Sequence, residues 1–461
     1  MNMSSAAQEE KGGDRAAIRL QILRLSLPIA ITLLAQNIYS LIDSFFLSGL
    51  GEEALSALAL ATILQTILNT LFVGIATGMN VQIAKAMGAQ SLPSARKNVS
   101  NGLLLQLALA VLIAICGALL VRSYFSGSSN DLIVIAYGTS YLTPLLILCV
   151  LTALQITIER ILQAIQLPKL SMISQIVGLC VNLALDPLLI FGIGHFSGFG
   201  MRGAAIATLT GQLVAATVAL LFLFRFKGEL IKDLLKTKLP DWETIRGIVS
   251  IGIPASAVSI LTALGNYCIN RLLISYQSTS NAVFSVYNRI ESFLMLPRQA
   301  ISIGTMTLFS YYVGKKEVPK IRAIFFQAEL ISAVWSLSCA LFCMLLSGSL
   351  MRLFHLSGET LRMGFACFSI ISFTYLPSGI MAVMNSFCQS TGKSRYTLAF
   401  ILIRQMVRIP AAILLFQTGV IDHIWWSWPI SEVASDLMLL LLFIRHFRRV
   451  EKTIQGQNDI D

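Results

Sequence analysis

Two carboxyl groups lie deep within apolar segments of the sequence, where a charge is costly. Asp43 is the one charged residue in 25–50, and Asp186 is the one charged residue in 170–194. Inserting an acid among lipid-facing helices costs at least about 2.5 kcal/mol, so such residues normally face a polar interior or serve a function. These two acids are therefore the first candidates for binding a cation.

The helical rise brings both acids to the same level. At about 1.5 Å per residue from the predicted cytoplasmic flanks, Asp43 lies roughly 27 Å deep and Asp186 roughly 24 Å deep. Asn182 precedes Asp186 by four residues and shares its helix face. Thr208 enters the following segment from the outside and reaches a similar depth. We expect these four residues to form one site in the outer half of a membrane.

This predicted site suits two kinds of ion. Two carboxyls in a poorly solvated pocket do not readily both ionise, so we expect at least one to hold a proton. A proton taken up and released as the pocket changes couples an ion gradient to conformation, and through a potential of about 100 mV it supplies about 2.3 kcal/mol. The same oxygens also suit a hard cation such as sodium. The sequence leaves both ions open.

A purely structural interpretation is the alternative. Asp43 and Asp186 would then each cap or kink a helix through local hydrogen bonds, and Pro187 does leave a backbone carbonyl free beside Asp186. Pro28 is expected to bend the first segment and to act as a hinge, with a static kink as the other interpretation.

Membrane-spanning helices must position these groups. Of the 461 residues, 56% are hydrophobic and 12% are charged, whereas soluble domains contain about 25% charged residues. Twelve apolar segments reach the roughly 20 residues needed to cross a bilayer. These are 23–50, 54–86, 98–121, 132–158, 170–194, 203–224, 247–275, 281–313, 321–351, 361–388, 396–418 and 424–444, of which 281–313 is interrupted by Arg289, Glu291, Pro297 and Arg298.

The second half of the chain repeats the pattern of the first half. Residues of the first half recur 226 positions later as the same residue type: Pro28, Gly78, Gly88, Pro93, Arg96 and Gln163 match Pro254, Gly304, Gly314, Pro319, Arg322 and Gln389. Six crossings separate equivalent positions, so both halves have the same orientation in the membrane. Paired bundles of this kind enclose a central site that is reached alternately from either side, as in secondary transporters.

The predicted fold is an all-α membrane protein with twelve transmembrane helices in two six-helix bundles related by a parallel internal repeat. Five parts follow along the chain: a cytoplasmic N-terminal segment (1–22), an N-terminal six-helix lobe (23–224), a cytoplasmic linker (225–246), a C-terminal six-helix lobe (247–445) and a cytoplasmic tail (446–461).

The distribution of charge sets the predicted orientation. The net charge is +11, and if residue 1 is cytoplasmic, 25 of the 34 Lys and Arg fall on inside segments and five on outside segments. This bias predicts that both termini are cytoplasmic, in a cell (inner) membrane. The basic residues form no cluster on a recognisable nucleic-acid-binding module, so we expect no nucleic-acid partner. The charged N-terminus has no cleavage site, so we expect the first span to be retained.

The second half departs from the acidic pattern of the first. The position matching Asp43 is near Asn270, and Asn182 is matched by Arg408, with Arg404 one turn before it. Both arginines could line a cavity, but pairing with Glu432 and Asp436 is the favoured interpretation. Three residues flanking the loop after the fourth span are expected to be solvated anchors: Glu159, Arg160 and Lys169.

At these residues the sequence resembles the multidrug and toxic compound extrusion (MATE) family. The resemblance covers about 23–445 and is carried by LSLPIAITLLAQNIYSLIDSFFLSGLGEEALSALALA (25–61), ILQAIQLPKLSMISQIVGLCVNLALDPLLIFGIGHFSGFGMRGAAIATLTGQ (161–212) and the echo SFCQSTGKSRYTLAFILIRQMVRIPAAILLF (386–416). It implies two six-helix bundles in a V shape that export organic molecules in exchange for protons or sodium.

The resemblance also assigns roles to residues. The family's first-helix acid falls on Asp43, its fifth-helix Asn and Asp on Asn182 and Asp186, and its sixth-helix Thr on Thr208. Two chamber-lining positions fall on Gln36 and Tyr39. One branch of the family has acids in the seventh and tenth helices, but 259–265 and 376–381 contain none here. The chain therefore resembles the branch with its ion site in the N-terminal lobe.

The leading hypothesis is an antiporter that expels amphipathic, often cationic compounds, because its acids offer charge complementarity and an apolar chamber binds tolerantly. The alternative is a lipid-linked saccharide flippase of the same superfamily, for which Arg298, Arg404 and Arg408 would supply a cationic cavity. The sequence has no HExxH motif, GxGD-like dyad or Ser/His pair, so we expect no enzyme activity. We also expect a monomer in the bilayer, a small organic substrate and no cofactor, since none of the eight Cys has metal-ligand spacing.

Overall fold

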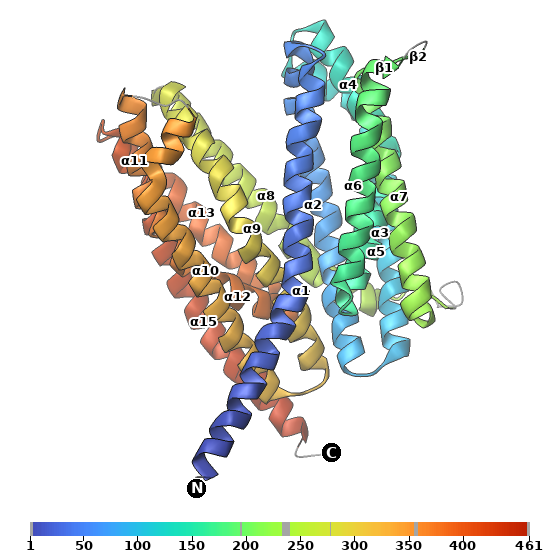
Figure 1. The fold of residues 1–461 in the computed structure, drawn as a ribbon, viewed down its shortest axis with the longest axis vertical. Helices are drawn as coiled ribbons and strands as arrows, with labels where there is room; N and C mark the ends of the chain where they lie inside the picture. The colour runs from blue at the N-terminus through green and yellow to red at the C-terminus, as the bar shows by residue number, and fades with distance from the viewer. Residues whose placement is uncertain (1–2, 194–195, 233–239, 277, 355–357, 459–461) are drawn as a thin grey trace. The chain divides into compact units, whose positions relative to one another are not determined.

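The computed structural model describes residues 3–193, 196–232, 240–276, 278–354 and 358–458. Two of the four histidines of the sequence, His195 and His355, and part of the predicted linker therefore lie outside the described residues. The described chain is almost entirely helical (Figure 1). Its elements are α1 (Met3–Ser48), α2 (Glu52–Gly88), α3 (Leu92–Ser128), α4 (Leu132–Ile147), α5 (Cys149–Ala164), α6 (Pro168–Phe191), β1 (Gly192–Ile193), β2 (Phe196–Ser197), α7 (Met201–Lys227), the 3-10 helix η1 (Gly228–Leu230), α8 (Trp242–Tyr276), α9 (Ser278–Gly314), α10 (Val318–Leu353), α11 (Gly358–Ser372), α12 (Tyr375–Ser390), α13 (Ser394–Phe416), α14 (Ile421–Ile424) and α15 (Ser427–Asn458).

Most of these helices are long and apolar enough to cross a membrane. Nine of the described helices qualify individually, and two bent pairs, α4 with α5 and α11 with α12, bring the number to eleven. The twelfth predicted span corresponds to α9, which is 37 residues long. Charged residues interrupt this helix, as the sequence shows for 281–313, and its composition is correspondingly more polar.

The internal repeat is visible in the element boundaries. α2 begins at Glu52 and α9 begins 226 residues later, at Ser278. The same offset separates the two breaks, because Leu148 divides α4 from α5 and Thr374 precedes α12. The chain bends by 53° at the first break and by 43° at the second. The duplicated sequence therefore produces the same irregularity twice.

The described chain forms two compact units whose boundaries fall inside helices. Unit 1 contains 1–30 and 257–461, and unit 2 contains 31–256. The boundary in α1 lies two residues after Pro28, and the boundary in α8 lies two residues after Pro254. The first part of each helix therefore packs within the unit formed by the other half of the sequence. The predicted domain limits concern membrane topology and stay predictions.

Glycines allow these helix beginnings to pack closely. In unit 2, a Cβ atom at Gly78 of α2 would lie 2.2 Å from the backbone oxygen of Ile248 in α8. In unit 1, a Cβ atom at Gly304 of α9 would lie 2.6 Å from Ser26 Oγ in α1. Both separations are too short for a side chain. Gly78 and Gly304 occupy equivalent positions of the internal repeat, so the same close contact between two helices occurs in both units.

Short connections and helix starts follow from local sequence. Asp131 caps α4 by accepting a hydrogen bond from the backbone N–H of Ile133 at 2.8 Å, as an N-cap aspartate does. Proline occupies the first turn of α3, α6 and α10, where its missing N–H has no helical partner to lose. The start of α1 and the end of α15, which both belong to unit 1, lie at the same end of that unit (Figure 1).

Candidate functional site

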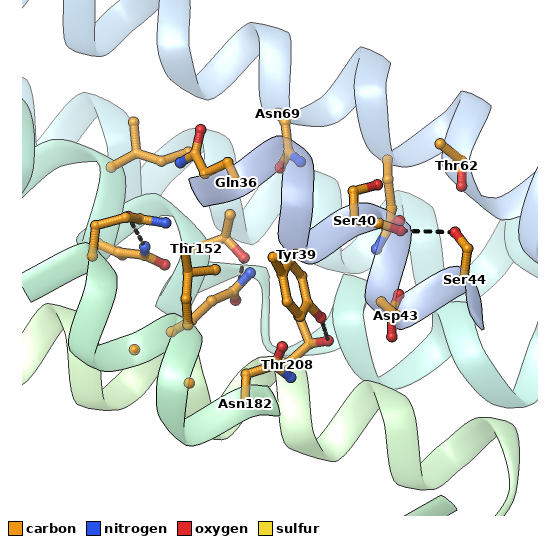
Figure 2. A pocket seen from close by; sticks show the side chains of 18 of the residues that line it. Gln36, Tyr39, Ser40, Asp43, Ser44, Thr62, Asn69, Thr152, Asn182 and Thr208 are labelled. Carbon is orange, nitrogen blue, oxygen red and sulfur yellow. Dashed lines mark hydrogen bonds between the residues drawn. The ribbon is translucent and has the colours of Figure 1, made fainter. Parts of the chain in front are cut away.

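Unit 2 contains a cavity of about 410 Å³ between its helices. Its wall is built from α1, α2, α4, α5, α6 and α7, and most of the side chains that line it are amides or hydroxyls. Figure 2 shows this pocket from close by. Five of the residues predicted from the sequence line it: Gln36, Tyr39, Asp43, Asn182 and Thr208.

α1 presents three of these residues on one face. Gln36, Tyr39 and Asp43 are spaced by three and four residues, which aligns their side chains along a helix. Asp43 is 7% exposed. The Tyr39 ring points across the pocket towards α7, and its hydroxyl lies 3.5 Å from Thr208 Oγ1 (Figure 2). The structure thus joins the predicted first-helix and sixth-helix positions directly.

Asp186 lies behind the pocket wall. Asn182 lines the cavity, and its Nδ2 donates to Asp186 Oδ1 at 3.3 Å along α6. Asp186 itself is fully buried. Its charge interacts with that of Asp43, so the two carboxyls belong to one electrostatic group. The four residues predicted as an ion site are therefore close together, although their role in ion coupling stays a prediction.

Several oxygens of this group have no hydrogen-bond partner among the described residues. They are Asp43 Oδ1, Asp186 Oδ2 and Asn182 Oδ1, all of them shielded from solvent. A buried oxygen without a donor is unfavourable by about 1 to 3 kcal/mol. A bound proton or an oxygen-coordinated cation relieves this cost, so the donor set fits either ion.

The rest of the polar lining was missed by the sequence analysis. It includes Gln65, Asn69, Gln155, Gln175 and Gln212. A signal was present, because amides inside apolar segments recur at helical spacing: Gln65 and Asn69 are four residues apart on α2. We call the part of the pocket formed by Gln36, Gln155 and Gln175 its inner end, and the part near Asp43 and Asn182 its outer end.

The prediction that Glu159 is a solvated anchor is wrong. Glu159 is 8% exposed, and Gln155 Nε2 donates to its Oε1 at 3.2 Å. The reason is that α5 continues to Ala164, more than one turn beyond Glu159, and carries this side chain into the bundle. Arg160 is half-buried, whereas Lys169 is exposed as predicted.

In unit 1 the two arginines have different partners. Arg404 Nη2 forms an ion pair with Glu432 Oε2 at 2.5 Å, which confirms the pairing predicted for it. Arg408 instead donates from Nε to Ser431 Oγ at 3.4 Å and lies over the Trp428 ring at 5.0 Å. Among the described residues Arg408 forms no ion pair, so its predicted pairing with an acid is wrong. Its contacts on α15 are a serine and an aromatic ring, and the nearby Glu432 pairs with Arg404 instead.

Comparisons with known proteins agree with this architecture. The sequence profile of the MatE family matches residues 28–188 and 254–414, two segments with the same 226-residue offset as the repeat. The chain is 28% identical to a FAD transporter of Shewanella oneidensis over 65% of this chain and 66% of that protein. It is 23% identical to the multidrug export protein MepA of Staphylococcus aureus, over 93% of this chain and 94% of that protein.

Solved structures share the fold. A crystal structure of MATE in the bent conformation aligns with a TM-score of 0.87 at 21% identity, over 96% of this chain and 98% of that one. An outward-facing multidrug resistance MATE family transporter aligns with a TM-score of 0.86 at 22% identity, over 94% and 97% of the two chains. The prediction of twelve transmembrane helices in two six-helix bundles is confirmed by this likeness.

Proposed function

The chain belongs to the MatE family, and we propose that it is a secondary active antiporter that exports amphipathic, cationic organic compounds in exchange for protons or sodium by alternating access. A multi-pass membrane protein with an internal pocket suits transport. One relative in the comparisons is named a multidrug export protein and another a FAD transporter, so both names describe movement of organic molecules.

The observation that carries the proposal is the pair of buried carboxyls at the outer end of the pocket. Asp43 forms part of the wall, and Asp186 lies behind it with an oxygen that has no partner among the described residues. A cavity of about 410 Å³ lies within the range that holds drug-sized ligands, about 300 to 1,000 Å³. Negative charge in such a cavity favours an organic cation.

The mechanism we propose is competition for this charge. When the coupling ion neutralises Asp43 and Asp186, the pocket has little attraction for a cationic substrate. When the ion leaves, the carboxyl charge returns and the substrate binds in its place. Because each ligand favours a different conformation, an ion gradient can drive the substrate the other way. Tyr39 and Thr208 would hold the α1 and α7 walls in register while Asn182 orients Asp186. Pro28, beside the unit boundary in α1, would be the hinge.

The remaining features of the proposal follow from its place in a membrane. We propose a monomer in the cell (inner) membrane with both termini cytoplasmic, which binds a small organic substrate and the coupling ion and needs no cofactor or nucleic acid. It would be a transporter and not an enzyme. The flippase alternative called for a cationic cavity formed by three arginines, and one of these, Arg404, is paired with Glu432.

Transport into lipid vesicles tests the proposal. Purified protein in vesicles should move a cationic dye when a proton or a sodium gradient is imposed, with the two gradients applied separately to identify the ion. Asp43→Asn should abolish this coupled transport while the protein still folds and inserts. Asp131→Asn is the matched control, since asparagine also caps a helix and Asp131 lies outside the pocket. Wild-type rates in the Asp43 variant would remove Asp43 from the mechanism.

A further inference from the structure

A third carboxyl group lies behind the inner end of the pocket, and the antiport scheme makes no use of it. Glu159 is on α5, one turn after Gln155, and is 8% exposed. The side chains between it and the cavity are three pocket-lining amides, those of Gln36, Gln155 and Gln175. An ionisable group that bonds to such amides can change which of their atoms the pocket presents.

The amide of Gln175 fits two hydrogen-bonding orientations. In one, its Oε1 accepts from Gln155 Nε2 at 2.6 Å. In the reversed one, its nitrogen donates to Glu159 Oε1 at 2.6 Å and to Oε2 at 3.0 Å, while its oxygen accepts from Gln36 Nε2 at 3.1 Å. The reversed nitrogen also lies 2.6 Å from Gln155 Nε2, so the Gln155 amide has to turn with it, and Glu159 then exchanges its Gln155 donor for the Gln175 donor. The two orientations differ in which atom faces Glu159 on one side and Gln36 on the other.

The protonation state of Glu159 selects between these orientations. An ionised carboxylate only accepts hydrogen bonds, so it favours the orientation in which the Gln175 nitrogen faces it. A protonated carboxyl has a hydroxyl to donate and favours the Gln175 oxygen. Gln36 turns with Gln175, because its Nε2 faces Gln175 and two amide nitrogens do not hydrogen-bond to each other. An ionised Glu159 therefore leaves the Gln36 oxygen for the pocket, whereas a protonated Glu159 leaves the Gln36 nitrogen.

Glu159 is well separated from the acids of the outer end. Gln175 precedes Asp186 by eleven residues on α6, which corresponds to about 16 Å along the helix. Glu159 itself lies five residues before α5 ends, or about 7 Å from that end of the bundle. It is therefore positioned to exchange a proton at one face of the bundle while the outer carboxyls lie towards the other.

The charges around Glu159 leave it without an ion pair among the described residues. Arg160 is the one charged residue that interacts with it, and the Arg160 guanidinium donates to Gln163 Oε1 at 3.1 Å instead. The helices packed against α5 carry further cations towards this end of the bundle, none of which interacts with Glu159: Lys85 of α2, Arg96 and Lys97 of α3, Lys169 of α6, and Arg225 and Lys227 of α7.

We infer that Glu159 is a proton-holding positioning residue, whose protonation reverses the amides of Gln175 and Gln36 and so exchanges an acceptor for a donor at the inner end of the pocket. Substrates with N–H groups bind when Glu159 is ionised and are released when it is protonated. For its substrate, this inference rests on the antiport function proposed above.

Ethidium, an aromatic cation with two amino groups, is a suitable probe. Its affinity for the purified full-length protein is measured by fluorescence from about pH 5 to about pH 9, the range in which buried carboxyls titrate. We expect wild-type affinity to rise with pH in two steps, of which the one due to Glu159 is about tenfold, or about 1.4 kcal/mol. Glu159→Gln should remove that step, Asp43→Asn should remove the other, and Glu159→Asp should keep both. Glu229→Gln is the matched control, as an exposed glutamate at the same end of the bundle.

Infrared difference spectra against Glu159→Gln give a readout without substrate. They should contain a protonated-carboxyl band that titrates in this pH range. Absence of the band overturns the inference, and so does a Glu159→Gln profile that superimposes on wild type, or loss of the step in Glu159→Asp, which would indicate a steric effect. If neither wild type nor any variant binds ethidium while the carboxyl band still titrates, the proposed export function is contradicted, whereas the inference that Glu159 takes up a proton is supported.

Discussion

Gly78 offers the sharpest test of how this chain packs. In Gly78→Ala, the new methyl group would lie 2.2 Å from the oxygen of Ile248, 3.0 Å from its carbonyl carbon and 3.2 Å from Gly252 N. All three atoms belong to the backbone of α8, so no side chain can rotate away. Relief requires this part of α8 to shift by about 1 Å, and overpacking of this kind costs about 1 to 3 kcal/mol. Replacing a helical glycine gains about 0.5 to 1 kcal/mol, so the net effect is destabilising.

The control for this prediction is Gly127→Ala. Gly127 is also helical, in α3, but a Cβ atom there would have nothing within 4 Å. We expect Gly127→Ala to raise the thermal unfolding midpoint of the detergent-solubilised protein slightly and Gly78→Ala to lower it. Equal midpoints for the two variants, or a Gly78→Ala protein as stable as wild type, would refute the argument that the glycine is required for close approach of α2 and α8.

Two further predictions concern charges away from the pocket. Glu432→Ala should lower the free energy of unfolding by about 3 to 5 kcal/mol, because it leaves Arg404 without its partner. The double variant Glu432→Leu with Arg404→Leu should lower it much less. Equal decreases in the thermal unfolding midpoint for the single and the double variant would contradict this prediction. Hydrogen bonds from Thr244 and Lys97 lower the pKa of Asp241 to about 2. The stability that this carboxylate provides is therefore present above its unfolded pKa of about 4 and is lost as the pH falls towards 2. The difference in thermal unfolding midpoint between wild type and Asp241→Ala should therefore be constant above about pH 4 and should shrink as the pH falls below that value.

The fold could be predicted from the sequence because it depends on two features that are visible in the sequence itself, segment hydrophobicity and internal repetition. Apolar segments of membrane length predict the spans, and the repeated residues predict the paired bundles. The bends at Leu148 and Thr374 were not predicted. Pro144, four residues before the first break, and Pro377, three residues after Thr374, are local causes of the two bends.

The sequence identified residues of the site only where the residue type is unusual for its surroundings. A single acid in an apolar segment stands out, so Asp43 and Asp186 were identified without a structure. Glutamine is common enough inside helices that Gln155 and Gln175 did not stand out. Glu159 was misplaced because a charged residue near the end of a span is equally compatible with solvent. Its burial depends on how far α5 continues, which is a property of the bundle and not of the surrounding sequence.

The internal repeat gives a reason to expect the ion-coupling residues in unit 2 and not in unit 1. At the 226-residue offset, Asp43 corresponds to Ile269 and Asp186 to Ala412. Both of these apolar residues are buried in one hydrophobic cluster of unit 1, so the positions that hold two carboxyls in one unit are filled by core packing in the other. Asn182 corresponds to Arg408, whose positive charge would repel a cation at the matching place. The same repeated position therefore serves two different chemistries. We expect Asp43→Asn to abolish ion-coupled transport, while the equivalent change Ile269→Asn affects folding instead.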